Sequence, residues 1–178
     1  MEMKKNGFTL IEIMVVVGIL GIIAAIGSGA FFSILRGSTK TKTLQMVKQN
    51  GDYAISVMGR MIRNARKIEF PTITGESSFI TIKNPDGGTT TFKCCEVGFD
   101  ALIASESGSL VCQDARLTSS EVKIENCSGV FNLLDVGQPG VKPAVVKINF
   151  NLKQAGTASR PEEQAVVNFQ TTITLRNY

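Results

Sequence analysis

Four cysteines are the residues of this 178-residue chain best suited to covalent chemistry. They are Cys94, Cys95, Cys112 and Cys127. A four-cysteine zinc site is disfavoured, because the sequence contains no Cys-x-x-Cys pair and no histidine. Disulfide bonds are the preferred prediction, and they imply an oxidising, exported setting for this part of the chain. If Cys94 and Cys95 lie on one strand, they point to opposite faces, so each pairs with Cys112 or Cys127. The sequence leaves both of those patterns open.

Residues for enzymatic catalysis are sparse. The absence of histidine removes the commonest general base, and there is no Gly-x-Ser-x-Gly, phosphate-binding loop or paired-carboxylate motif. Four scattered aspartates near turns are interpreted as turn formers in preference to calcium ligands, with calcium binding left open. They are Asp86, Asp100, Asp114 and Asp135. We therefore predict no enzymatic activity, no cofactor and no metal site.

One acidic residue, Glu12, stands at the beginning of a long apolar segment. Residues 13–35 carry no charge, and this stretch exceeds the ~20 residues that a helix needs to cross a membrane. An acid at the centre of a membrane helix costs roughly 2.5–3.5 kcal/mol, and somewhat less near an end. The helix offers no nearby cation, so the Glu12 carboxylate calls for a partner elsewhere.

The residues before the apolar segment favour one orientation. Lys4 and Lys5 precede the span and predict a cytoplasmic N-terminus. Cationic residues also follow the span, so the cysteines supply the stronger reason to place the C-terminal part outside. A cleaved secretory signal is disfavoured, because the apolar run is too long and no Ala-x-Ala site directly follows it.

Residues 4–12, with the sequence KKNGFTLIE, resemble the class III signal of type IV prepilins and type II secretion pseudopilins. The resemblance covers residues 4–26 and rests on a basic leader, a glycine, a phenylalanine, an acid and a long apolar run. It implies that residues 1–7 are a leader peptide. A prepilin peptidase would cut between Gly7 and Phe8 and then methylate the new amine of Phe8.

The same resemblance implies a role for Glu12 in subunit assembly. Its carboxylate would pair with the Phe8 ammonium of a neighbouring subunit in the apolar core of a fibre. A subunit in the wrong register would leave a buried charge unpaired, at a cost of several kcal/mol.

Beyond the apolar segment, the pattern changes twice. From residue 39 to residue 68, apolar residues recur every three or four positions, which predicts an amphipathic helix that ends by Phe70-Pro71. Residues 71–178 then predict a β-rich domain. Its expected strands are residues 79–84, 89–95, 146–152 and 167–175, with weaker candidates at 110–113 and 122–126. The turn at residues 85–88 (PDGG) predicts a hairpin.

The predicted fold class is α+β and pilin-like, with a long N-terminal helix on a C-terminal antiparallel sheet. The expected divisions are residues 1–7, 8–35 (transmembrane and assembly), 36–70 (amphipathic) and 71–178 (exported). The resemblance implies a single-pass inner-membrane protein that assembles with other pilin or pseudopilin subunits into a fibre.

Within that family, the amphipathic run, the hairpin-rich domain and the C-terminal residues look most like J-type and related minor pseudopilins. The alternatives are the major pilin, a membrane-tethered tip adhesin, or a DNA-contacting competence pilin. The net charge is +4, and the one basic cluster, residues 60–67, is interpreted as a solvated helix face in preference to a nucleic-acid contact.

Overall fold

The computed structural model describes residues 7–98, 100–108, 110–138, 140–156 and 164–176. The leader residues Lys4 and Lys5 lie outside this range. A single long helix, α1 (Leu10–Asn64), precedes all of the described strands. The chain divides into two compact units, Met1–Thr39 and Lys40–Tyr178.

The first unit contains the apolar half of α1. Its most apolar window has a mean hydropathy of 2.7, and none of that window is buried. Every described residue up to Lys40 is exposed, including the large side chains between Phe8 and Leu35. This confirms the predicted apolar N-terminal helix, and an apolar surface of this extent requires lipid or protein to cover it.

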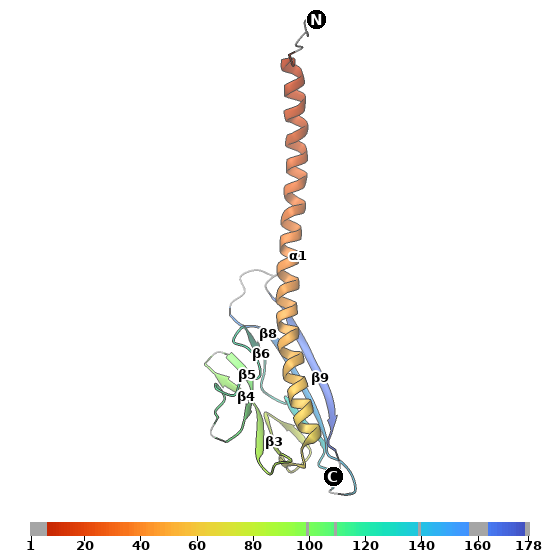
Figure 1. Ribbon diagram of the computed structural model, residues 1–178, viewed down its shortest axis with the longest axis vertical. Coiled ribbons are helices and arrows are strands. Elements are labelled where there is room, and N and C mark those ends of the chain that lie inside the picture. The colour runs from red at the N-terminus through yellow and green to blue at the C-terminus, as the bar shows by residue number, and fades with distance from the viewer. Residues whose placement is uncertain (1–6, 99, 109, 139, 157–163, 177–178) are drawn as a thin grey trace, which may run out of the picture. The chain divides into compact units, whose positions relative to one another are not determined.

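The second unit combines the rest of α1 with an antiparallel sheet (Figure 1). The strands are β1 (Lys67–Phe70), β2 (Gly75–Ser77), β3 (Phe79–Lys83), β4 (Thr89–Val97), β5 (Asp100–Glu106), β6 (Val122–Ile124), β7 (Phe131–Asp135), β8 (Val145–Gln154) and β9 (Val166–Thr174). The strand order among the described residues is β1-β3-β4-β5-β6-β8-β7-β2, with β9 paired to β8. Strand β8 is central, because β6 and β7 pair along one edge and β9 pairs along the other. The α+β class is confirmed.

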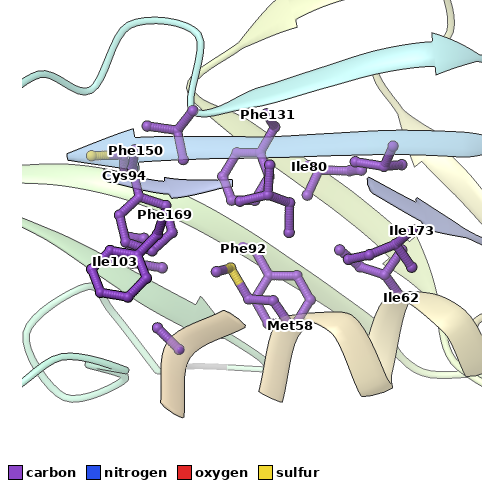
Figure 2. Packing of buried hydrophobic residues seen from close by; sticks show 14 of the residues in the cluster. Met58, Ile62, Ile80, Phe92, Cys94, Ile103, Phe131, Phe150, Phe169 and Ile173 are labelled. Carbon is purple, nitrogen blue, oxygen red and sulfur yellow. The ribbon is translucent and has the colours of Figure 1, made fainter. Parts of the chain in front are cut away.

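The amphipathic half of α1 packs on this sheet. Its buried positions are Thr43, Val47, Gly51, Ala54, Met58, Gly59 and Ile62, which recur every three or four residues. Figure 2 shows Met58 beside Phe92, and Ile62 beside Ile173. Fully burying a side chain of this kind contributes roughly 1.5–3 kcal/mol, so this stripe anchors α1 to the sheet.

Two glycines of the stripe differ in what lies above them, and this predicts opposite effects of substitution. A Cβ added at Gly51 would overlap the ring of Phe169, which itself stacks on Phe150. A Cβ at Gly59 would lie 3.6 Å from the Ile173 Cδ1 atom, an ordinary contact. We expect Gly51→Ala to reduce the free energy of unfolding by about 2 kcal/mol through overpacking. We expect Gly59→Ala to raise it by up to about 1 kcal/mol through helix propensity.

The two variants control for each other, because each replaces a buried helical glycine with alanine. The measurement is urea unfolding of the full chain in detergent, with protease resistance of the sheet as the readout. It gives the change in the free energy of unfolding for each variant. Equal shifts of the two midpoints would contradict the close helix–strand packing at Gly51.

The predicted end of the amphipathic helix was wrong. Helix α1 ends at Asn64, and Lys67–Phe70 forms β1 in place of a last helical turn. The Arg66 N–H donates to the Lys83 carbonyl at 2.8 Å, and Ile68 pairs with Ile82. Ile68 fits the apolar spacing of a helix and also that of a strand. Its pairing with β3 decides for the strand and overrides the helical spacing.

Strand predictions succeeded where alternation was clear. Strands β3, β4, β8 and β9 occupy the expected places, and the turn at residues 85–88 joins β3 to β4. The weaker candidate at 122–126 forms the shorter β6. The candidate strand at 110–113 was wrong, because this segment is a loop and turn. Strand β5 was missed because Leu102, Ile103 and Ala104 are buried consecutively, which hides the alternation.

Candidate functional site

The first helical turn is closed by reciprocal hydrogen bonds between Thr9 and Glu12. The Thr9 N–H donates to the Glu12 Oε2 atom at 3.1 Å, and the Thr9 hydroxyl donates to the same oxygen at 3.2 Å. The Glu12 N–H donates in return to the Thr9 Oγ1 atom at 3.3 Å. Because Leu10 is the first helical residue, Thr9 is the N-cap and the pair forms a capping box.

This geometry gives Glu12 partners that the sequence reasoning missed. The Thr-x-x-Glu signal before an apolar run was present and would have revealed them. Glu12 is also the acidic residue of the first helical turn, at the positive end of the helix dipole. Glu12 is therefore held at the end of the helix nearest residue 8, as an acceptor with a fixed direction.

Gly7 and Phe8 lie immediately before this cap, outside the helix. Phe8 is 81% exposed, and a Cβ built on Gly7 would have no heavy atom within 4 Å. The peptide bond between them is therefore open to a protease, and the glycine lets another backbone approach closely.

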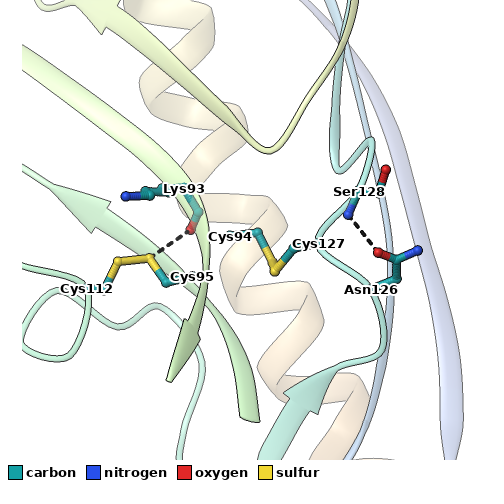
Figure 3. The surroundings of a disulfide bond; sticks show 7 residues. All are labelled: Lys93, Cys94, Cys95, Cys112, Asn126, Cys127 and Ser128. Carbon is teal, nitrogen blue, oxygen red and sulfur yellow. Dashed lines mark hydrogen bonds between the residues drawn. A yellow bond between two sulfur atoms is a disulfide. The ribbon is translucent and has the colours of Figure 1, made fainter. Parts of the chain in front are cut away.

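The four cysteines form two disulfide bonds, and the structure decides the pairing that the sequence left open. Cys94 is bonded to Cys127 and Cys95 to Cys112, with Cα–Cα distances of 5.3 and 6.3 Å. Both Cys94 and Cys95 lie on β4, and Figure 3 shows their bonds on either side of that strand. Cys94–Cys127 belongs to the main core, and Cys95 belongs to a smaller cluster on the other face.

The side chains of three of the four aspartates considered for calcium have other partners, and Asp114 lies in the turn after Val111, where its N–H donates to the Val111 carbonyl at 2.9 Å. Asp86 accepts a hydrogen bond from the Gly88 N–H at 2.8 Å, and Asp100 forms an ion pair with Lys123 at 3.1 Å. A hydrogen bond from Lys142, aided by the Gly137 N–H, lowers the pKa of Asp135 below its ordinary value. These roles fit turn and surface stabilisation.

One group of potential metal ligands occurs among the described residues, formed by Cys95, Glu106 and Cys112. Two of its members share a disulfide bond, so they cannot supply thiolates to a metal ion.

Comparison with known proteins supports the interpretation of the N-terminus. Residues 3–28 match the prokaryotic N-terminal methylation motif. The N-terminal segment is therefore a class III, prepilin-type signal, and the α+β fold that follows it is pilin-like. The chain is also similar to prepilin peptidase-dependent protein D of Escherichia coli (strain K12), with 52% identity over 42 residues. That match covers 24% of this chain and 29% of the relative's length. No solved structure matches the chain.

Proposed function

We propose that this chain is a structural subunit of a type IV pilus or a type II secretion pseudopilus. The observation that carries the proposal is the methylation motif at residues 3–28, joined to the apolar first half of α1, whose most apolar window has no buried residue. Residues 1–7 are the leader, residues 8–35 serve first as membrane anchor and then as fibre core, and the disulfide-bonded domain is exported. A prepilin peptidase and other pilin or pseudopilin subunits are the partners.

The geometry at the helix start supports the proposed assembly step. Cleavage after Gly7 creates an ammonium group on Phe8, next to the cap that holds the Glu12 carboxylate. In the apolar interior of a fibre, that carboxylate pairs with the Phe8 ammonium of a neighbouring subunit. Such a buried ion pair defines the register of neighbouring subunits, because a displaced subunit leaves both buried charges without a partner.

The orientation in the membrane is part of the same proposal. The N-terminus faces the cytoplasm, where Lys4 and Lys5 remain, and the domain after the span is translocated. Two disulfide bonds in that domain support an oxidising destination, since cytosolic proteins rarely keep them.

We propose further that the subunit is a minor one, present in few copies per fibre. The support is its likeness to J-type minor pseudopilins in the amphipathic helix and hairpin-rich domain. Quantitative mass spectrometry of purified fibres tests this, with the major pilin of the same fibre as internal reference. A ratio near one would assign the chain to the major subunit.

Processing is the most direct test of the whole proposal. Co-expression with a prepilin peptidase is expected to remove seven residues and to add a methyl group to Phe8, and intact-mass analysis of the membrane extract reads both changes. The same chain expressed without the peptidase is the control. A chain that keeps Met1 in both samples would instead be a lone signal-anchored domain.

A further inference from the structure

A groove lined by three arginines lies where α1 ends beside β9. Its volume is about 440 Å³, and its lining includes Arg60, Arg63 and Arg176. The first two lie on the last turns of α1, and Arg176 follows the end of β9. Figure 1 shows β9 running beside this part of the helix. Residues more than a hundred positions apart in the sequence are thus brought to one surface.

A backbone hydrogen bond links the segments that carry Arg63 and Arg176. The Arg176 N–H donates to the Arg63 carbonyl at 2.9 Å, which joins the C-terminal segment to the last helical turn. Packing of Ile173 above Gly59 fixes the neighbouring turn. The backbone positions of Arg63 and Arg176 are therefore set by contacts within the domain.

These arginines have no acidic partner in the described part of the chain. Ion pairs there engage the nearby lysines instead, Lys67 with Glu69 and Lys142 with Asp135. A smaller adjoining groove shares Arg176 and adds Arg66, which likewise has no ion pair among the described residues. Four arginines consequently line two adjoining grooves, and none of them has an ion pair among the described residues.

Simpler explanations account for only part of this arrangement. A cation in the last turn of a helix offsets the negative end of the helix dipole, which explains Arg63. That effect falls off within one turn and gives no reason for Arg176, which lies on a different element. Neither the dipole nor solvation explains why Arg60, Arg63 and Arg176 all line one groove.

The remaining lining selects for an anion with several oxygens. Arginine only donates hydrogen bonds, and its planar fork matches phosphate and carboxylate oxygens. The Ser56 and Thr171 hydroxyls and the Asn64 amide add further donors, and the described lining contains no carboxylate. Donors that come from two elements suit a tetrahedral phosphate better than a planar carboxylate.

We propose that this groove binds phosphate oxyanions, either free or as the phosphodiesters of a chain. The site is independent of the proposed role in a fibre, because it uses neither the N-terminal segment nor its processing.

The test uses the full chain in uncharged maltoside micelles. A fluorescent oligothymidylate is the probe in an anisotropy titration at several salt concentrations. The variant Arg60→Gln/Arg63→Gln/Arg176→Gln is expected to weaken binding about tenfold or more at low salt. The slope of log affinity against log salt should also fall by about two, since each phosphate contact contributes about 0.7 for a single strand.

A matched control removes the same charge elsewhere. The variant Lys48→Gln/Lys93→Gln/Lys147→Gln lowers the net charge equally, away from the groove, and is expected to change the affinity less than about twofold. An Arg-to-Lys triple variant should keep most of the salt dependence and lose affinity, because the charge remains and the fork is lost. Limited proteolysis checks that each variant is folded.

Competitors at constant ionic strength identify the source of the phosphate. Displacement by pyrophosphate assigns the groove to free phosphates, and resistance to pyrophosphate assigns it to phosphodiester chains. Three results would overturn the proposal. The Arg-to-Gln triple variant could bind the probe like the original chain, or the Lys-to-Gln triple variant could lose as much affinity as the Arg-to-Gln variant. Polyglutamate of matched charge could also displace the probe as well as a phosphate competitor does.

Discussion

Glu12→Gln is expected to leave cleavage after Gly7 intact and to reduce incorporation into fibres by on the order of a hundredfold. An amide at this position still accepts the hydrogen bonds of the capping box, so the start of the helix is preserved. What is lost is the negative charge, which leaves the Phe8 ammonium unpaired in an apolar core at roughly 3–5 kcal/mol. The measurement is the ratio of subunit in sheared fibres to subunit in the membrane.

Thr9→Val is the matched control, because it removes the capping hydroxyl and keeps the charge of Glu12. Loss of a cap of this kind costs about 1 kcal/mol, so incorporation should fall by less than about tenfold. If Thr9→Val were as severe as Glu12→Gln, or if Glu12→Gln incorporated normally, Glu12 would be a helix cap without a charge-pairing role.

Removal of the Cys94–Cys127 disulfide bond has the second large expected effect. The variant Cys94→Ser/Cys127→Ser should lose about 4 kcal/mol of stability, because the bond closes a loop between residues 33 positions apart. The variant Cys95→Ser/Cys112→Ser, with a separation of 17, should lose about 3 kcal/mol. Burial increases the difference, since Cys94 and Cys127 lie in the main core and serine would bury a hydroxyl there.

Urea unfolding of the full chain in detergent, monitored by protease resistance of the sheet, measures both losses. The unsubstituted chain under reducing conditions separates loop closure from the serine substitution, because its sulfurs remain in place. If removal of the Cys95–Cys112 bond cost more stability than removal of Cys94–Cys127, neither loop length nor core burial would determine how much each bond stabilises the fold.

Local signals in the sequence predicted local structure well. The charge-free run at residues 13–35 predicts a membrane-spanning helix by itself, because that prediction depends only on the length and apolarity of the segment. Strands β8 and β9 alternate cleanly because only one face of each is buried, and both were predicted from that alternation. The capping box is equally local, because it depends only on the three-residue spacing of Thr9 and Glu12.

Other features depend on which segments meet in space. Ile68 fits a helix and a strand equally well in one dimension, and its pairing with Ile82 across β1 and β3 decides between them. Strand β5 packs against a hydrophobic cluster on each face, so its apolar residues are consecutive and show no alternation in the sequence. Residues 110–113 form a loop and turn in spite of Leu110 and Val111, and Cys112 within this segment is bonded to Cys95 of β4.

The sequence by itself determined the character of residues 1–35: a basic start, a glycine–phenylalanine junction, an acid and an apolar helix. These are properties of one continuous segment, and their physical meaning depends on the membrane rather than on the rest of the chain. Only the tertiary structure decided the disulfide partners and the meeting of Arg176 with Arg60 and Arg63. Contacts between distant residues form when a helix and a sheet bury their apolar faces against each other. They depend on both elements together, so neither segment of the sequence specifies them alone.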